Sequence, residues 1–97
     1  MNTLREATEE YLSMRRALGF KLRETGARLL DFVTFMEQHR ASYITQQLAL
    51  TWAQQSPTVL PSTWAQRLRF VRGFARYRSA TDPRTQIPPD RIRRSLF

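Results

Sequence analysis

The sequence predicts a small all-α domain made of four helices. Apolar residues recur at intervals of three and four along four separate segments, which is the spacing of one helical face. Helix-start signals accompany these segments, and no stretch has a convincing strand pattern. The chain has 97 residues, 41% of them apolar, which is enough for one hydrophobic core and too little for two.

The first predicted helix covers about residues 3–18. Its apolar face consists of Leu4, Ala7, Tyr11, Met14 and Leu18. Thr3 and Glu6 have the spacing of a capping box, in which each side chain satisfies a free backbone amide at the helix start. Gly19 suits the left-handed position after a helix, and we expect Phe20 to fold back on Met14.

The second predicted helix covers about residues 21–40 and the third about residues 45–55. The apolar stripe of the second helix consists of Leu22, Leu29, Phe32, Val33, Phe35 and Met36. Gly26 lies inside it and costs ~1 kcal/mol relative to alanine, which predicts close packing or a loose first turn. Thr45 is a good N-cap for the third helix, and Ser56 followed by Pro57 ends it.

The fourth predicted helix covers about residues 63–79 and begins with a second capping-box pair, Thr63 and Gln66. Its buried stripe consists of Trp64, Leu68, Val71, Phe74 and Ala75. From Thr81 onward, proline and polar residues predict an extended C-terminal tail. The chain thus divides into a helical domain, residues 1–80, and a tail, residues 81–97.

The charge balance favours a polyanionic partner. The chain has 16 basic and 8 acidic residues, a net charge of +8, and all but one of the basic residues are arginine. A guanidinium group forms planar, bidentate contacts with phosphates and with guanine edges. The absence of cysteine excludes disulfides and thiolate metal sites, zinc fingers included.

Other function classes find little support in the sequence. The longest uncharged stretch, residues 41–66, is broken by polar residues and two prolines, and the N-terminus lacks the apolar core of a signal peptide. We therefore expect a cytoplasmic protein with no membrane partner. The single histidine, His39, has no second histidine for a metal, and no tyrosine has a neighbouring base. We expect no catalytic residues, no cofactor, no metal and no small-molecule substrate.

Basic and polar residues at two predicted helix starts are the candidates for binding double-stranded DNA. These residues are Lys21, Arg23, Arg28, Ser62, Thr63, Gln66, Arg69, Arg72 and Arg76. The three fourth-helix arginines project within ~60° of one another, no acidic residue lies three or four positions away, and polar groups precede them. The alternative is a solvated charged face. Arg15 and Arg16 either extend the patch or, because Glu9 and Glu10 precede them, belong to an ion-paired surface.

Two segments resemble a known family. They are GFKLRETGARLLDFVTFME, from Gly19 to Glu37, and STWAQRLRFVRGFARY, from Ser62 to Tyr77. Between them, Ile44 and Thr45 followed by Leu48 and Trp52 look like the family's entry to a third helix. In this order and spacing, over about residues 3–80, the chain is similar to the N-terminal core-binding, or SAM-like, domain of phage-integrase-type tyrosine recombinases.

The resemblance implies a compact four-helix SAM-like bundle that closes over one side of a recombination site. In such domains the second and fourth helices lie against the major groove, where Lys21, Arg23, Ser62, Thr63, Gln66 and Arg69 would fall. Lys21 departs from the family, where threonine is common, and Arg72 matches a recurrent arginine that packs or touches phosphate. The family's catalytic residues have no counterpart here, so the tail would lead toward a catalytic domain outside this chain.

The family implies double-stranded DNA as the partner, with further recombinase protomers on the DNA and a role in DNA integration. A different class of function stays open: a helical protein–protein module whose basic face pairs with an acidic partner. Both readings depend on the same surface, so they differ in the partner and not in the fold.

Overall fold

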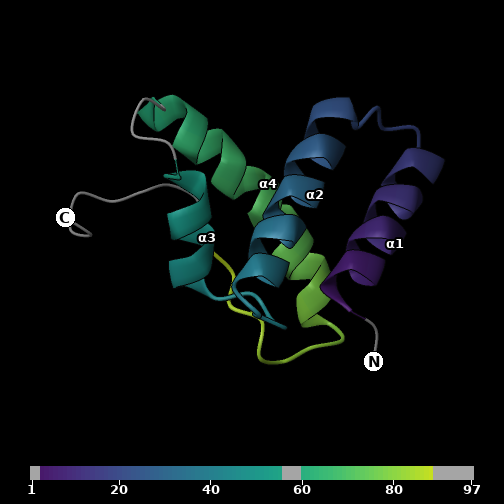
Figure 1. The fold of residues 1–97 in the computed structure, drawn as a ribbon. Coiled ribbons are helices and arrows are strands. Elements are labelled where there is room, and N and C mark those ends of the chain that lie inside the picture. The colour runs from purple at the N-terminus through teal and green to yellow at the C-terminus, as the bar shows by residue number, and fades with distance from the viewer. Residues whose placement is uncertain (1–2, 56–59, 89–97) are drawn as a thin grey trace.

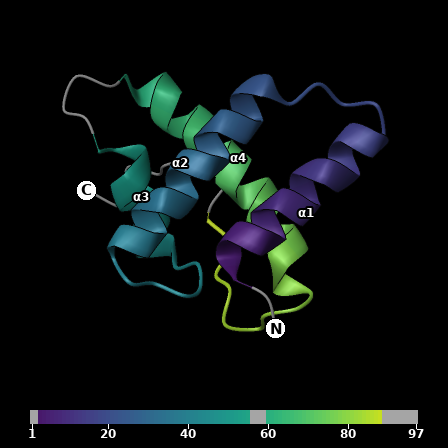
Figure 2. The ribbon, with the colours of Figure 1, turned by 45° about the vertical axis from the view of Figure 1, so that its right-hand side comes forward.

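The computed structural model describes residues 3–55 and 60–88. It contains four helices: α1 (Leu4–Ala17), α2 (Arg23–Gln38), α3 (Gln46–Ala53) and α4 (Pro61–Ser79), and the described ranges contain no strand. The predicted all-α class and the order of four helices are therefore confirmed. Helices α2 and α4 cross in the middle of the molecule, α1 packs on one side of them and α3 on the other (Figures 1 and 2).

The apolar stripes of the two central helices form the core. Every predicted apolar residue of α2 is buried, and so are those of α4 except the half-buried Trp64. On α1 the stripe is correct only as far as Tyr11. Met14 and Leu18 are exposed, 41% and 71%, because they lie beyond the point where α4 meets α1, and Leu12 is buried instead.

The helix ends follow local backbone chemistry. The Thr3–Glu6 capping box is present, and the Thr45 side chain accepts a hydrogen bond from the Leu48 amide at 3.1 Å, as predicted. Gly19 has φ +96° and its amide donates to the Arg16 carbonyl at 3.0 Å. The centroid of the Phe20 ring lies 4.4 Å from the guanidinium carbon of Arg15, so Phe20 packs against this cation. The contact of Phe20 with Met14 stays a prediction.

The predicted starts of α2 and α4 are wrong by two residues. α2 begins at Arg23, so Lys21 lies in the connection before the helix. α4 begins at Pro61, and no capping box forms between Thr63 and Gln66. Proline is favoured at the first helical position because its missing N–H has no intrahelical acceptor there and its φ is already helical. Pro61 therefore starts the helix, and Thr63 lies in its first turn.

The first part of the predicted tail packs on the helical domain. Asp82 is fully buried, the Gln86 amide donates to the Ile44 carbonyl at 2.9 Å, and the Gln46 side chain donates to the Ile87 carbonyl at 3.2 Å. Residues 82–88 therefore form a strap across the entry to α3, without helix or strand. Residues 89–97 of the predicted tail lie outside the described residues, and the domain boundary at residue 80 stays a prediction.

Gly73 lies in α4 where that helix meets Tyr11 of α1. A Cβ atom at position 73 would lie 2.9 Å from the Tyr11 hydroxyl oxygen. We expect Gly73→Ala to lower the free energy of unfolding by about 1 kcal/mol, because the clash outweighs the gain in helix propensity. In a Tyr11→Phe background, the same change should raise that free energy by up to about 1 kcal/mol. Urea unfolding of all four proteins measures this, and equal effects in both backgrounds would contradict the close approach.

Arg40 adopts a left-handed backbone conformation, φ 54°, just after α2. The turn is closed by the Arg40 amide, which donates to the Glu37 carbonyl at 3.0 Å, and by the Ala41 amide, which donates to the Met36 carbonyl at 2.9 Å. Glycine adopts this conformation without steric cost, so Arg40→Gly should raise the free energy of unfolding by about 1 kcal/mol. Urea unfolding measures the change, and a less stable variant would mean that the arginine side chain itself stabilises the turn.

Candidate nucleic-acid interface

The end of α1, the start of α2 and the start of α4 lie along one edge of the molecule, with the start of α2 between the other two (Figures 1 and 2). Their side chains line three adjoining hollows. Glu24 lines the first and second, Phe70 the second and third, and Leu22 the first and third, so the hollows form one surface. We call this surface the basic end. Its basic residues are Arg15, Arg16, Lys21, Arg23, Arg28, Arg67 and Arg69.

The charge of the basic end is not neutralised by neighbouring carboxylates. Seven basic side chains share the three hollows with one acidic side chain, Glu24. None of the seven forms an ion pair with a carboxylate within residues 3–55 and 60–88. Unpaired like charges held on one surface attract an anion and repel one another, so a polyanion bound here would relieve that repulsion.

Two helix starts add backbone groups to the basic end. The first helical residues carry amide groups without intrahelical acceptors, and the helix dipole adds positive potential at the same place. Neither Leu22 before α2 nor Leu60 before α4 supplies a side-chain cap, unlike Thr3 and Thr45 at the other two helices. The helix starts without a side-chain cap, those of α2 and α4, therefore lie at the basic end. The helices with a capped start are α1 and α3.

Most of the predicted site residues come together at this end. Lys21 and Arg23 line the first hollow; Arg28, Thr63 and Gln66 line the second. Arg69 lines the third hollow, and Ser62 is exposed beside Thr63. The structure thus brings together two groups of residues, within 21–28 and 62–69, that are at least 34 positions apart in the sequence.

Two predicted site residues on α4 lie outside the three hollows. Arg72 is half-buried, and its Nε donates to the Pro88 carbonyl oxygen at 3.1 Å, so it holds the strap. Arg76 is exposed about two turns beyond Arg69. Helical spacing predicts one row formed by Arg69, Arg72 and Arg76. The row is interrupted at Arg72, because the strap contacts α4 there.

Three members of the basic end were not among the predicted site residues. Arg15 and Arg16 make no ion pair with Glu9 or any other described carboxylate, and Arg15 lies over the Tyr11 and Phe20 rings. Arg67 packs its guanidinium 5.9 Å from the Trp52 ring and donates to the Ala53 carbonyl at 3.3 Å. The sequence signal for the α1 pair is their position in its last turn, just before the glycine that turns the chain toward α2.

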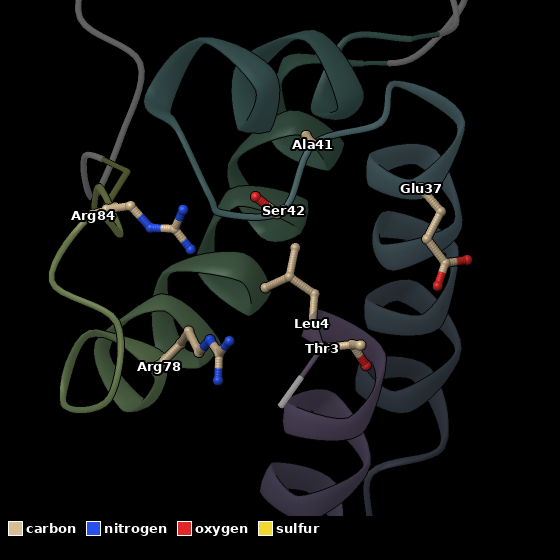
Figure 3. A pocket seen from close by; sticks show the side chains of 7 residues that line it. All are labelled: Thr3, Leu4, Glu37, Ala41, Ser42, Arg78 and Arg84. Carbon is tan, nitrogen blue, oxygen red and sulfur yellow. The ribbon is translucent and has the colours of Figure 1, made fainter. Parts of the chain in front are cut away.

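A further pocket lies away from the basic end, between α1, the chain after α2 and the strap (Figure 3). Arg78 and Arg84 lie on one side of it and Glu37 on the other. Arg84 donates to both carboxylate oxygens of Asp82, at 3.0 and 2.8 Å. This pairing, helped by Arg78, lowers the pKa of the buried Asp82 carboxyl to about 2. The arginines here stabilise a structural carboxylate.

The described residues contain no cluster of three or more side chains that could hold a metal ion. His39 contacts the Phe35 carbonyl oxygen through Nδ1 at 2.9 Å, at the end of α2. Within the ranges 3–55 and 60–88, no helix combines the length and the apolar character that crossing a bilayer requires.

Comparison with known proteins gives one informative match. A protein of Sinorhizobium fredii (strain NBRC 101917 / NGR234) named "Putative integrase/recombinase y4rB" is 58% identical to this chain over 89 residues. The chain is similar to part of an integrase/recombinase. The match covers 92% of the chain but 28% of that protein, so the chain spans less than a third of its relative's length. No family model matches the chain, and no solved structure matches it.

Proposed function

We propose that this chain is the core-binding DNA-binding domain of a site-specific tyrosine recombinase or integrase. It binds duplex DNA with α2 and α4 and contributes to DNA integration or recombination without catalytic residues of its own. The observation that carries this proposal is the basic end, where seven unneutralised basic side chains, six from three helices and Lys21 from the connection before α2, share one surface with a single carboxylate among the described residues.

The two helix starts supply different contacts in this proposal. Guanidinium groups of Arg23, Arg28 and Arg69, with the Lys21 ammonium, bind phosphates and set the register on the duplex. Thr63 and Gln66 line the same hollow as Arg28 and have the neutral donors and acceptors that read base edges in the major groove. Phosphate contacts supply affinity in this arrangement, and the polar pair supplies selectivity.

The named relative is consistent with this assignment. A chain similar to 28% of an integrase/recombinase suits one domain of a protein whose chemistry belongs to another part. A single domain of this kind should bind random DNA weakly, with a Kd of ~10⁻⁴ to 10⁻⁶ M near physiological salt. Double-stranded DNA and further recombinase protomers on it are the proposed partners, and residues 81–97 the proposed link toward the catalytic part.

A gel-shift experiment with a random duplex at low salt, competed with heparin, tests the proposal. We expect a shift that heparin removes and that weakens steeply as salt is added. Circular dichroism of the same sample verifies that the helices are intact. No shift from a folded chain would overturn the DNA assignment and favour an acidic protein partner for the basic end.

A further inference from the structure

Among the described residues that line the basic end, Glu24 is the one acidic side chain beside seven basic ones. It is exposed in the first turn of α2 and lines both the first and second hollows. Glu24 makes no hydrogen bond or ion pair with any residue that the structure describes, although Arg23 and Arg28 belong to the same hollows. Its carboxylate is therefore available to a ligand.

A carboxylate is the wrong group for the phosphate backbone. It can only accept hydrogen bonds, and phosphate oxygens likewise only accept, so the two groups repel each other. The amino groups on base edges do donate, and in the major groove the cytosine N4 amino group is the one that glutamate accepts from. A carboxylate placed among phosphate-binding cations therefore favours contact with an amino group on a base edge. It disfavours contact with groups that only accept hydrogen bonds.

The second hollow supplies the remaining contacts of such a reading group. Glu24 and Arg28 come from α2, and Thr63 and Gln66 come from the first two turns of α4. One side chain only accepts, one only donates, and the other two can do both. A hollow that holds acceptors as well as donors can recognise amino groups on base edges, which a purely cationic hollow cannot accept from.

We infer that Glu24 is a specificity-determining residue that accepts a hydrogen bond from a cytosine amino group and weakens binding to sequences without it. This inference rests on the proposed DNA-binding function. The other role open to Glu24 is to stabilise the start of α2 through the helix dipole. That role affects stability and leaves base preference unchanged.

The test is selection of bound duplexes from a randomised pool, followed by sequencing, with the intact chain and with Glu24→Gln. We expect the wild type to enrich cytosine at one position and Glu24→Gln to reduce that preference about tenfold. Affinity for random duplex should rise about twofold, since one repulsive charge is removed. The salt slope should not change, because no phosphate contact is lost.

Glu9→Gln is the matched control, because Glu9 is an exposed glutamate on α1 that lines none of the three hollows. It should leave the base preference unchanged. A wild-type preference that persists in Glu24→Gln, or a wild type that binds without any preference, would overturn this inference and leave the DNA-binding proposal standing. Failure of the folded wild type to bind any duplex would overturn both.

Discussion

Replacing Arg23 and Arg69 together by alanine is expected to lower the affinity for random duplex DNA about a hundredfold at low salt. A hydrogen bond to a charged phosphate contributes about 1.4 kcal/mol, or tenfold, for each guanidinium. The two side chains come from different helices, the start of α2 and the middle of α4, and line different hollows, so their effects should add. The slope of log affinity against log salt should become about two units shallower. Fluorescence anisotropy over a range of salt concentrations measures both quantities.

The double variant should fold like the wild type. Both arginines are exposed, and neither makes a hydrogen bond or ion pair with a residue that the structure describes. Arg40→Gly is the matched control, since it removes one positive charge just beyond the opposite end of α2. It should change neither the affinity by more than about twofold nor the salt slope. The single variant Arg23→Ala is compared with Arg40→Gly, since each removes one positive charge. An equal loss of DNA affinity in both would mean that net charge alone governs binding.

Asp82→Asn is expected to detach the strap. It should lower the free energy of unfolding more than any other single substitution proposed for this chain. The Asp82 side chain is 1% exposed and accepts three hydrogen bonds from Arg84, one from the backbone amide and two from the guanidinium. The charge of Arg78, which is 2% exposed, also lowers the pKa of this carboxyl. Hydrogen exchange at the Gln86 amide reports detachment, and Thr3→Ala, which loses a helix cap at an exposed site, provides a control.

The effect of Asp82→Asn should depend on pH in a defined direction. Because the folded state lowers the Asp82 pKa from 3.8 to about 2, the carboxylate stabilises the protein fully above about pH 4. That contribution is lost as pH falls toward 2, when the folded protein takes up the proton. The stability difference between wild type and Asp82→Asn should therefore be constant from pH 7 to about pH 5 and shrink below pH 4. A difference that does not change with pH would contradict the ion pair.

The elements that the sequence predicts correctly are those whose causes are local. The 3.6-residue period of α2 and the cap at Thr3 involve residues a few positions apart, so they can be read from the chain itself. The start of α4 was misplaced because Thr63 and Gln66 have capping-box spacing, while the proline two residues earlier already meets the demands of a helix start. Two local signals, the Thr63–Gln66 spacing and Pro61, each indicated a different first residue of α4. The spacing alone did not show which of them starts the helix.

The candidate site was predictable in its composition and only in part in its arrangement. Arginines near the start of α2 and along α4, such as Arg23 and Arg69, are visible in the sequence, and the structure brings these two to one surface. The sequence could not show that Arg72 is engaged by the strap, since its acceptor lies 16 residues away at Pro88. It also could not show that Arg15 and Arg16 would line the basic end, because that depends on which helices pack beside the end of α1.

The sequence by itself determined that this chain is helical, basic and rich in guanidinium groups, since periodicity, capping and charge are properties of neighbouring residues. The tertiary structure alone decided which of those charges share a surface and which hold the fold together. Arg69 and Arg78 lie on the same helix, yet one is exposed at the basic end and the other is buried beside Asp82. The physical reason is that burial and charge pairing depend on which helices pack against each residue, and those helices come from distant parts of the chain.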